Sequence, residues 1–363
     1  MQILFIAPIP PPINGQSKAS NMVLDVLKKD NEITIVNLSK QSLKSGEVSF
    51  SRFLKIISIL KEVWIKRMSN DVIYISIAES TIGNIRDLLI YAICFKDIDK
   101  ICLHMLGGAG MTNIIEGNGL LSKLNHFFLR RVGGVIVEGV LNYNIFSKYV
   151  DKNKVHIVPN FADDYLFLTE KEVELKFDKL QPLQILYLSN LIYGKGYKEL
   201  LEAYLGLPTD IKCQINLTFV GGFESTNDEQ EFGNNIKDIE NIRYLGKVFD
   251  IDRKRALYAS AHVFCLPTYY PFEGQPLSIL EAYASGCVVI TTNHSGIPFI
   301  HTDGINGWVV KKQSTESLKL ALRDVFEKRL ELPLIAKNNL LEATQKYRPQ
   351  KFQEKITSIF NRN

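Results

Sequence analysis

The chain has 363 residues, more than one hydrophobic core usually organises, so we expect two domains of ordinary size. With 46% hydrophobic and 23% charged residues, its composition is that of a globular protein and excludes extensive disorder. The formal net charge of +4 lies within residues 1–165, which hold 19 basic and 15 acidic residues, while the remainder balances at 24 against 24. This balance argues against a general nucleic-acid binder and leaves room for a local basic surface that faces anionic lipid or phosphate.

Short apolar runs rich in β-branched residues alternate with longer amphipathic stretches, which is the pattern of parallel strands joined by helices. In the first half we expect strands at 2–7, 33–37, 72–77, 100–106, 133–138 and 155–158. After a charged, poorly periodic stretch the pattern restarts, with strands at 184–189, 214–220, 242–245, 262–266 and 287–291. The sequence therefore predicts two α/β domains, residues 1–170 and 180–345. A helix at 332–347 ends before Pro349, which should change the chain direction, and a last helix follows at 350–360.

The cysteines predict an intracellular protein. Cys94, Cys102, Cys213, Cys265 and Cys287 lie among apolar neighbours, without a Cys-x-x-Cys pair or a histidine at metal-ligand spacing. We expect buried, reduced thiols in a cytosolic compartment. The N-terminus opens directly on a strand-like run, so no export signal is expected. No stretch reaches the roughly 18 uncharged apolar residues that a spanning helix needs, and the expected location is cytoplasmic.

The loop after the strand at 262–266 carries the strongest chemical signal, because ligands of open α/β sheets bind outside the carboxyl ends of the strands. Glu273-Gly-Gln-Pro-Leu-Ser278 leads into a helix at 279–285 closed by Gly286. A helix N-terminus preceded by glycine offers backbone N–H groups to a phosphate. Glu273 and Glu281 bracket this anion site, and carboxylates accept hydrogen bonds from sugar and ribose hydroxyls, which suggests a nucleotide-sugar. The alternative is that Glu273 caps the helix and Glu281 is a solvated helix residue.

Two further strand ends in the second domain favour the same kind of ligand. Asn190-Leu-Ile-Tyr-Gly-Lys195-Gly196 presents a lysine between two glycines, and this lysine can neutralise a diphosphate leaving group. Taken alone, the loop would be interpreted as a turn with a solvated lysine. Phe219-Val-Gly-Gly222 permits a close backbone approach at the same edge of the sheet. The two loops reinforce each other.

Four segments in order resemble the retaining glycosyltransferases of family 4, which have the GT-B fold. They are Pro10-Pro-Pro-Ile-Asn-Gly15-Gln16, Val158-Pro-Asn160, the pair Lys195-Gly196, and Glu273-x7-Glu281 with Gly274. The match extends from residue 3 to about 310. The resemblance implies two Rossmann-like, doubly wound domains that face each other across a cleft, with the acceptor on the N-terminal domain and the donor on the C-terminal one. It also implies that the final segment, 346–363, returns to pack on the N-terminal domain.

The resemblance also assigns roles to individual residues. Glu281 would hold the donor ribose, Glu273 would sit near the sugar hydroxyls, and Lys195 would stabilise the leaving group. Gly15 would let the N-terminal backbone approach the diphosphate. The backbone of the turn would face the same diphosphate; this turn consists of Gly274, Gln275, Pro276, Leu277 and Ser278. A second strand end, with Lys247 and Val248, would contact the base.

The chain departs from the family pattern at two positions. Asn190 stands where the family commonly has an arginine, so leaving-group stabilisation would draw on another base such as Lys198 or Arg131. His104 lies two residues before the position where relatives carry a histidine ahead of a glycine. Strand alternation puts His104 and Leu106 on one face, so His104 is a candidate near the reacting sugar. The alternative is a buried core histidine.

Three other signals have structural explanations. Asp97-Ile-Asp99 and Asp250-Ile-Asp252 match a two-carboxylate metal pattern, but each lies beside basic residues in an expected turn or helix start, so no metal is expected. Gly107-Gly-Ala-Gly110 is half a dinucleotide fingerprint without the complete spacing, so no nicotinamide cofactor is expected. Residues 53–67 mix lysines with large apolar residues and fit either an anionic membrane surface or a core-facing helix with a basic outer face, which we favour.

The resemblance implies a retaining, metal-independent transferase. Its donor would be a nucleotide-sugar, with UDP preferred to GDP, and it would move a hexose or N-acetylhexosamine to a glycan or lipid-linked acceptor. The process would be the synthesis of a bacterial surface polysaccharide, such as O-antigen, lipopolysaccharide or capsule. The resemblance also implies peripheral contact of the enzyme with the cytoplasmic face of the inner membrane. The alternatives are a sugar-nucleotide epimerase or a phosphorylase of the same architecture, or a non-catalytic nucleotide-sugar-binding subunit.

Overall fold

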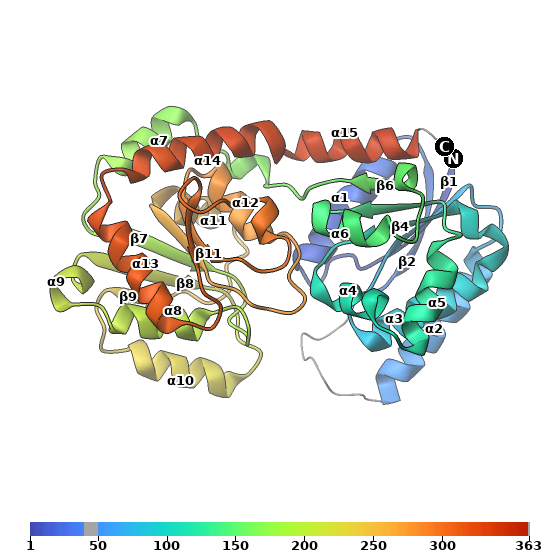
Figure 1. Ribbon diagram of the computed structural model, residues 1–363, viewed down its shortest axis with the longest axis horizontal. Coiled ribbons are helices and arrows are strands. Elements are labelled where there is room, and N and C mark those ends of the chain that lie inside the picture. Colours follow the sequence, from blue (N-terminus) through green and yellow to red (C-terminus); the bar gives the residue numbers. More distant parts are fainter. Residues whose placement is uncertain (40–49, 362–363) are drawn as a thin grey trace. The chain divides into compact units, whose positions relative to one another are not determined.

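The computed structural model describes residues 1–39 and 50–361, which fold into two compact units (Figure 1). Unit 1 comprises Met1–Asn160 together with the C-terminal segment from Phe352. Unit 2 comprises Phe161–Lys351. In the described residues each unit is built on its own parallel sheet of six strands. Unit 2 therefore includes residues 161–180, which the sequence analysis left to the first domain or to the connection.

The sheet of unit 1 has the order β2-β1-β3-β4-β5-β6. Its strands are β1 (Gln2–Ala7), β2 (Glu32–Asn37), β3 (Val72–Ser76), β4 (Ile101–Met105), β5 (Gly134–Val137) and β6 (Val155–Ile157). Its helical segments are α1 (Gly15–Leu27), α2 (Phe50–Lys66), α3 (Thr81–Ile93), η1 (Phe95–Lys100), α4 (Ala109–Glu116), α5 (Leu120–Leu129), α6 (Val140–Phe146), η2 (Lys152–Lys154) and α15 (Pro349–Phe360).

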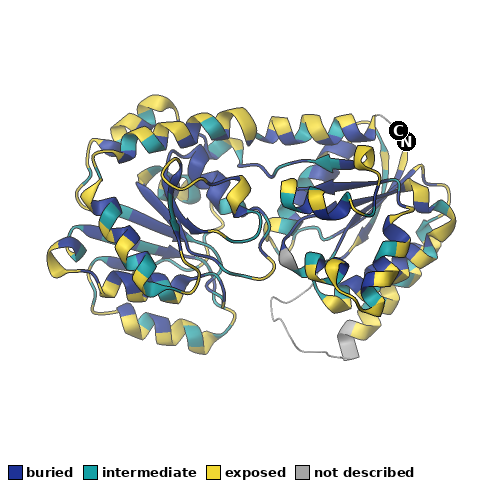
Figure 2. Cartoon of the chain, viewed as in Figure 1, coloured by how far each residue is buried: buried dark blue, intermediate teal, exposed yellow. Residues whose placement is uncertain are grey.

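Strand alternation divides the core of unit 1 between the two faces of its sheet. Leu4 and Ile6 of β1 pack in one cluster with side chains of the helices from α2 to α6, including Val63 and Phe128. Phe5 points to the opposite face, where its ring stacks on Tyr74 at a centroid distance of 4.5 Å. Figure 2 shows the result, with buried strands in the middle and helices whose outer sides are exposed.

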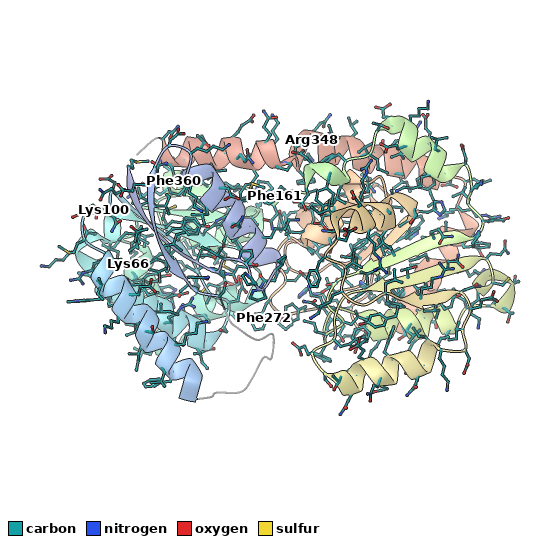
Figure 3. All side chains as sticks on the ribbon, turned by 180° about the vertical axis from the view of Figure 1, so that it is seen from behind. Lys66, Lys100, Phe161, Phe272, Arg348 and Phe360 are labelled. Carbon is teal, nitrogen blue, oxygen red and sulfur yellow. The ribbon has the colours of Figure 1, made fainter. Side chains whose placement is uncertain are left out.

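Helix α15 covers that second face. The Phe360 ring lies 6.4 Å from the Tyr74 ring, and the Gln353 amide contacts Met22 Sδ of α1. Figure 3 labels Phe360 near the end of this helix. Helix α14 of unit 2 ends at Lys346 and α15 begins at Pro349, because a proline fits a first helical turn but interrupts a helix interior. The last helix therefore returns to the first domain, as the resemblance implied.

The sheet of unit 2 has the order β12-β11-β10-β7-β8-β9. Its strands are β7 (Leu183–Leu188), β8 (Ile215–Val220), β9 (Ile242–Tyr244), β10 (Val263–Leu266), β11 (Val288–Thr292) and β12 (Gly307–Val310). Its helical segments are η3 (Asp164–Leu166), α7 (Glu170–Phe177), α8 (Tyr197–Leu205), α9 (Thr209–Lys212), α10 (Thr226–Ile236), α11 (Ile251–Ser260), α12 (Leu277–Ala284), η4 (Ile297–Phe299), α13 (Thr315–Glu327) and α14 (Leu332–Lys346).

Each predicted strand is present, with ends displaced by no more than a residue or two, whereas two elements were missed. Strand β12 lies at the edge of the sheet and begins with a glycine, a residue that is depleted in strands. Gly307 adopts a φ of +145°, and a Cβ there would lie 1.9 Å from the Val289 carbonyl oxygen. Helix α7 occupies the charged stretch that looked irregular. A capping box of Thr169 and Glu172 starts it, and only Val173 and Phe177, one helical turn apart, are buried.

Two smaller expectations were wrong. Helix α12 begins at Leu277, two residues before the predicted start, and Pro276 is its N-cap. Cys213 is exposed, because it follows the short surface helix α9, while the other four cysteines are buried as expected. Gly286 has a φ of +58° directly after the C-cap of α12, as predicted for a closing glycine.

Replacing Phe360 by alanine tests the packing of α15. Phe360 is 1% exposed, so we expect Phe360→Ala to lower the free energy of unfolding by about 3 to 5 kcal/mol, as for other large-to-small changes in a core. Urea denaturation measures the loss. Leu341→Ala on the outer side of α14, where the side chain is 55% exposed, is the control and should change little. An equal midpoint for both variants would contradict the packing described here.

Candidate functional site

The loops that follow β7 and β10 bring Lys195 and Glu273 together. The two strands are neighbours in the sheet of unit 2, so the loops at their carboxyl ends meet at one edge. Lys195 Nζ lies 2.6 Å from Glu273 Oε2, although the residues are 78 positions apart in the sequence. The two side chains are only 14% and 9% exposed. A mostly buried ion pair at this edge is a stronger feature than a turn with a solvated lysine.

Thr268 and two glycines fix the geometry of this pair. Thr268 Oγ1 donates to Glu273 Oε2 at 2.9 Å and lies 3.2 Å from the Gly194 carbonyl oxygen, so it connects both loops. Gly196 has a φ of +78°, and a Cβ there would come within 2.4 Å of the Pro267 carbonyl oxygen. Glycine is required at this position because the loop that carries Lys195 lies directly on the end of β10.

The turn between Glu273 and α12 leaves a helix N-terminus without a side-chain cap. Pro276 is the N-cap residue and makes no capping hydrogen bond. Gly274, Gln275, Leu277 and Ser278 complete the turn, which therefore presents backbone N–H groups and the positive end of a helix dipole. Glu273 does not cap this helix, because its carboxylate is held by Lys195 and Thr268. The turn is suited to an anion with a phosphate group.

Glu281 is buried inside unit 2 rather than solvated, so the alternative interpretation of this residue was wrong. It is 3% exposed; Oε1 accepts from Lys254 Nζ at 2.7 Å, and Oε2 accepts from the Tyr258 hydroxyl at 3.1 Å. Burial, and then the nearby Glu281 carboxylate, hold the pKa of Tyr258 well above its ordinary value, so this hydroxyl stays a donor.

The loop after β11 packs against the same turn. A Cβ on Gly296 would lie 2.8 Å from the Gly274 carbonyl oxygen, so the two backbones touch. His294 Nε2 lies 2.8 Å from the Tyr270 carbonyl oxygen, and burial lowers the pKa of His294, which favours the neutral ring that donates here. Ser295 has a φ of +50°, and its Oγ is buried without a hydrogen-bond partner in the described residues. This loop shapes the turn.

The remaining predicted contacts of unit 2 gather at the ends of β7, β8 and β9. Leu191, next to Asn190, donates its N–H to the Gly222 carbonyl oxygen at 2.9 Å. Lys247 is exposed and its methylene chain lies over Gly222, where a Cβ would meet Lys247 Cε at 1.9 Å. Val248 is half-buried. Asn190, Lys247 and Val248 therefore share one edge of the sheet with Lys195.

In unit 1, His104 is enclosed in the core. It is 0% exposed, and its Nδ1 lies 2.6 Å from the Tyr74 hydroxyl on the face that α15 covers. Burial lowers the pKa of His104 to about 3, so the ring is neutral. These facts favour the core-histidine interpretation, and a role beside the reacting sugar stays a prediction. Gly15 is exposed at the first position of α1, behind an Asn14 capping box.

Glu79, which the sequence analysis missed, lies in the loop after β3. Its Oε2 accepts from the Gly110 N–H at 3.0 Å, and a Cβ on Gly107 would lie 2.2 Å from its Oε1. The chain's own carboxylate thus fills the anion site at the start of α4, where half a dinucleotide fingerprint had been noted. Oε1 is buried without a hydrogen-bond partner among the described atoms, and burial raises the pKa of Glu79 to about 7. A carboxylate after β3 facing a glycine-rich turn after the adjacent β4 was the available signal.

The two carboxylate pairs are structural. Asp97 forms an ion pair with Lys100 at 2.9 Å within η1, and Asp250 is the N-cap of α11, accepting from the Arg253 N–H at 2.7 Å. Across residues 1–39 and 50–361, no group of three or more His, Cys, Asp or Glu side chains is arranged to hold a metal ion. None of the helices described has the length and apolar character to cross a membrane.

Part of the chain is similar to known glycosyltransferases. Residues 170–346 match the family model "Glycosyl transferases group 1". An uncharacterized glycosyltransferase of Methanocaldococcus jannaschii, MJ1069, is 25% identical over 57% of this chain and 54% of its own length. A second relative is the N,N'-diacetylbacillosaminyl-diphospho-undecaprenol alpha-1,3-N-acetylgalactosaminyltransferase of Campylobacter jejuni. It is 29% identical over 51% of this chain and 46% of its own length. The chain thus spans about half the length of these two relatives.

Solved structures share the whole fold. Anabaena Alr3699/HepE in complex with UDP has a TM-score of 0.73 and 15% identity over 100% of both chains. WaaG, a glycosyltransferase involved in lipopolysaccharide biosynthesis, has a TM-score of 0.67 and 14% identity over 98% of this chain and 99% of its own. At such identities the likeness shows the fold, which is that of the GT-B glycosyltransferases.

Glu79→Gln tests the buried carboxyl. Because its pKa rises from 4.5 to about 7 on folding, the folded state binds the proton more tightly, and stability should fall as pH rises across this window. Glu79→Gln removes that loss, so its free energy of unfolding relative to wild type should increase by on the order of 2 kcal/mol between pH 4 and pH 8.

Urea denaturation over this pH range measures the difference in free energy of unfolding between the two proteins. The titration of His104 contributes equally to both and therefore cancels. Glu116→Gln, at a position whose side chain is 43% exposed, is the control. Parallel profiles for wild type and Glu79→Gln would show that folding does not raise the pKa of Glu79.

Proposed function

We propose that this chain, which carries a glycosyltransferase group 1 domain at residues 170–346 on a GT-B fold, transfers a hexose or N-acetylhexosamine from a nucleotide-sugar. The observation that carries the proposal is the Lys195 and Glu273 pair at the uncapped start of α12, with the buried carboxylate of Glu281 one helical turn further on. A cation, the backbone N–H groups of a helix N-terminus and two carboxylate acceptors match a diphosphate, a sugar and a ribose.

The donor diphosphate binds unit 2 at the start of α12. Lys195 Nζ and the N–H groups between Gly274 and Ser278 supply positive charge where the leaving group becomes more negative. The Glu273 carboxylate, which forms an ion pair with Lys195 in the structure, accepts hydrogen bonds from hydroxyl groups of the sugar. Asn190 leaves the diphosphate with one fewer cation than relatives commonly have, and Gly15 is proposed to add a backbone contact.

The nucleoside occupies the neighbouring edge. Glu281 accepts from the ribose hydroxyls, since Lys254 and Tyr258 fix the direction of its carboxylate. Lys247 and Val248 contact the base through their backbone. We propose UDP as the nucleotide; Alr3699/HepE, whose fold this chain shares, was solved with UDP and with UDP-glucose.

The proposed reaction breaks the bond between the anomeric carbon and the diphosphate oxygen and forms a bond to an acceptor hydroxyl on the same face. The acceptor proton passes to the departing diphosphate, so charge and atoms balance. Positioning and charge stabilisation by Lys195 and α12 supply the catalysis, without a metal ion. Retention is carried over from the resemblance to family 4.

The acceptor is a glycan or a lipid-linked oligosaccharide bound by unit 1. Relatives that match parts of the chain include the Erwinia amylovora amylovoran biosynthesis glycosyltransferase AmsK and the Escherichia coli O-antigen chain mannosyltransferase B. The C. jejuni relative's name specifies an undecaprenol-linked substrate. We therefore propose a role in bacterial surface polysaccharide synthesis, in the cytoplasm, with peripheral contact at the inner membrane.

Lys195→Ala tests the leaving-group role. We expect the rate of sugar transfer to fall by about 10²- to 10³-fold, as when a donor to a developing negative charge is removed. Lys237→Ala, at an exposed position directly after α10, is the control and should leave the rate within a few-fold of wild type.

Transfer to an acceptor is followed alongside loss of donor. An epimerase would consume donor without acceptor, and a non-catalytic subunit would bind donor without turnover. A Lys195→Ala variant as active as wild type would remove the basis of the proposal.

Glu281→Gln tests the ribose contact. The change keeps the shape of the side chain but removes the negative charge that accepts hydrogen bonds from the ribose hydroxyls. We therefore expect UDP to bind about tenfold more weakly, while inorganic pyrophosphate binds as before. Thermal shift measures both, since a ligand at about 100 times its Kd adds about 2.7 kcal/mol. Glu327→Gln, on the surface of α13, is the control. Equal losses for UDP and pyrophosphate would assign Glu281 to the diphosphate or to folding.

A further inference from the structure

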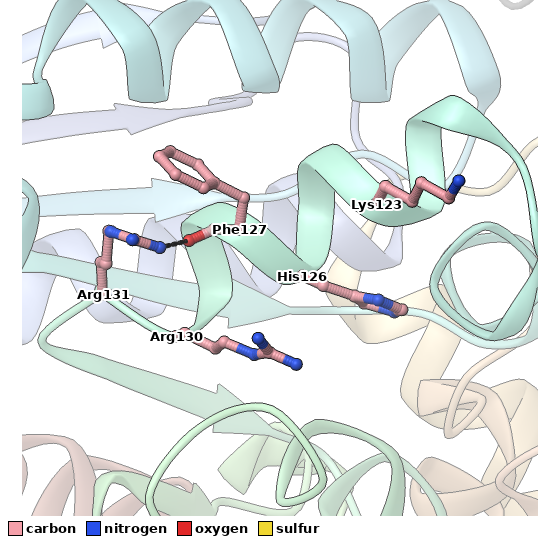
Figure 4. Close-up of a pocket in the computed structure, with 5 residues that line it drawn as sticks. All are labelled: Lys123, His126, Phe127, Arg130 and Arg131. Atoms are coloured by element: carbon pink, nitrogen blue, oxygen red, sulfur yellow. Dashed lines mark hydrogen bonds between the residues drawn. The ribbon is translucent and has the colours of Figure 1, made fainter.

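A hollow of about 570 Å³ on unit 1 lies outside the proposed donor site. Its lining residues are Lys123, His126, Phe127, Arg130 and Arg131, on and directly after helix α5. Figure 4 shows Arg131 hydrogen-bonded to the Phe127 carbonyl oxygen. His126 Nε2 lies 2.8 Å from the Ile115 carbonyl oxygen, and Lys123 and Arg130 are exposed. The polar groups of this hollow are thus held by the chain or open to solvent, and none of them needs a ligand.

Ser295, in the loop after β11 of unit 2, differs in this respect. Its Oγ is buried without a hydrogen-bond partner among the described residues. Its φ of +50° lies in the left-handed region, which is unfavourable for a residue with a Cβ. One residue therefore combines a strained backbone with an unsatisfied hydroxyl.

The conformation of Ser295 is not that of an ordinary surface turn. Ser69 and Gln313 are the other non-glycine residues with a positive φ among residues 1–39 and 50–361, at +65° and +53°. Both are exposed, as turn residues usually are, whereas Ser295 is half-buried. Strain that the surrounding structure maintains is found most often where a protein binds or converts a ligand.

The backbone on both sides of Ser295 is fixed. On one side, His294 Nε2 lies 2.8 Å from the Tyr270 carbonyl oxygen. On the other, a Cβ on Gly296 would lie 2.8 Å from the Gly274 carbonyl oxygen, so these two backbones touch. The loop after β11 is therefore attached to the loop after β10 before and after Ser295. These contacts hold the serine in its strained conformation.

Ser295 also lies close to the charged pair of the proposed donor site. Burial is the main cause of the lowered pKa of His294, and the charges of Glu273 and Lys195 act on the same ring. Gly274, which Gly296 touches, directly follows Glu273 in the chain. The loop after β11 therefore borders the turn at the start of α12.

The strand order indicates which part of a nucleotide-sugar lies beside this loop. In the order β12-β11-β10-β7-β8-β9, β11 flanks β10 on the side away from β7, β8 and β9. The proposed base contacts follow β9, and the proposed diphosphate contacts follow β7 and β10. A donor that extends from its base across the diphosphate therefore brings its sugar toward the loop after β11.

We propose that Ser295 recognises the donor sugar, through a hydrogen bond between its hydroxyl and a hydroxyl group of the hexose. The inference rests on the proposed function, since it assigns the sugar subsite of the same donor site. A serine hydroxyl both donates and accepts, which suits a sugar hydroxyl.

The hydroxyl of Ser295 can reach such a ligand at little cost. A serine side chain has three staggered positions, and Ser295 as a whole is only half-buried. Because Oγ has no partner among the described residues, a rotation toward the sugar breaks no hydrogen bond. The sugar then supplies the partner that the hydroxyl lacks in the free protein.

Titration calorimetry of the full chain with UDP, UDP-glucose, UDP-galactose and UDP-N-acetylglucosamine tests the proposal. For the UDP-sugar that wild type binds most tightly, Ser295→Ala should bind about tenfold more weakly, as expected for the loss of one hydrogen bond to the ligand. Its affinity for UDP should equal that of wild type. Ser295→Gly, which removes the hydroxyl and the backbone strain together, should show the same pattern.

Urea denaturation without ligand provides a second readout, which separates recognition from a structural role. Because the hydroxyl has no partner in the free protein, Ser295→Ala should unfold at the same urea concentration as wild type or a higher one. Ser295→Gly should be at least as stable as Ser295→Ala, since glycine adopts a positive φ without strain. A lower midpoint for Ser295→Ala would assign the hydroxyl a structural hydrogen bond and overturn the proposal.

The matched controls are Ser69→Ala and Ser69→Gly, at the exposed serine of unit 1 that also has a positive φ. Both should bind all four nucleotides as wild type does. Equal binding of the preferred UDP-sugar by wild type and the two Ser295 variants would overturn the inference and leave the proposed function standing. Equal losses for UDP and the UDP-sugar would also overturn it, because the loop would then only support the diphosphate turn. If wild type binds none of the four nucleotides, the proposed function is wrong and the inference fails with it.

Discussion

Lys195 and Glu273 can meet only because the backbone at the end of β10 admits another loop at very short range. The glycines on either side of Lys195 have φ values of +89° and +78°, and a side chain at either would press on Tyr270 or Pro267. Thr268 then fixes the carboxylate that fixes the lysine. The uncapped start of α12 gains a nearby cation from this arrangement, and the loop after β11 closes against its other side. The anion site is thus a consequence of close backbone packing at one sheet edge.

The two site carboxylates of unit 2 and Glu79 of unit 1 are held in different ways. In unit 2 each of the two site carboxylates has a lysine partner and a hydroxyl donor, Lys195 with Thr268 and Lys254 with Tyr258. Removing one member of such a pair leaves an uncompensated charge, which is costlier than the pair is favourable. In unit 1, Glu79 is held by backbone N–H groups alone, and burial raises its pKa to about 7. Its protonation therefore depends on pH in the physiological range.

The sequence was a good guide where the pattern repeats and a poor one where a contact depends on tertiary packing. The short apolar runs located the strands except β12, an edge strand of four residues that begins with a glycine. The Glu273 to Glu281 segment was recognisable as the start of a helix that two carboxylates bracket. The burial of Glu281 and its salt bridge with Lys254 could not be recognised, because Lys254 lies 27 residues away in the sequence, on another helix. Likewise, nothing local in the strand of His104 distinguishes a ring under α15 from one at a sheet edge.

The structure shows where the excess positive charge of the chain lies, which the composition alone does not. The excess of basic residues lies in residues 1–165, and on α5 two of those cations, Lys123 and Arg130, have no ion-pair partner in the described chain. In unit 2 the lysines of the site are each matched by a carboxylate. A paired lysine holds a carboxylate in a defined position, as a site for hydroxyl groups requires. An unpaired one keeps its full attraction for an external anion. The same residue type thus serves two purposes according to what faces it.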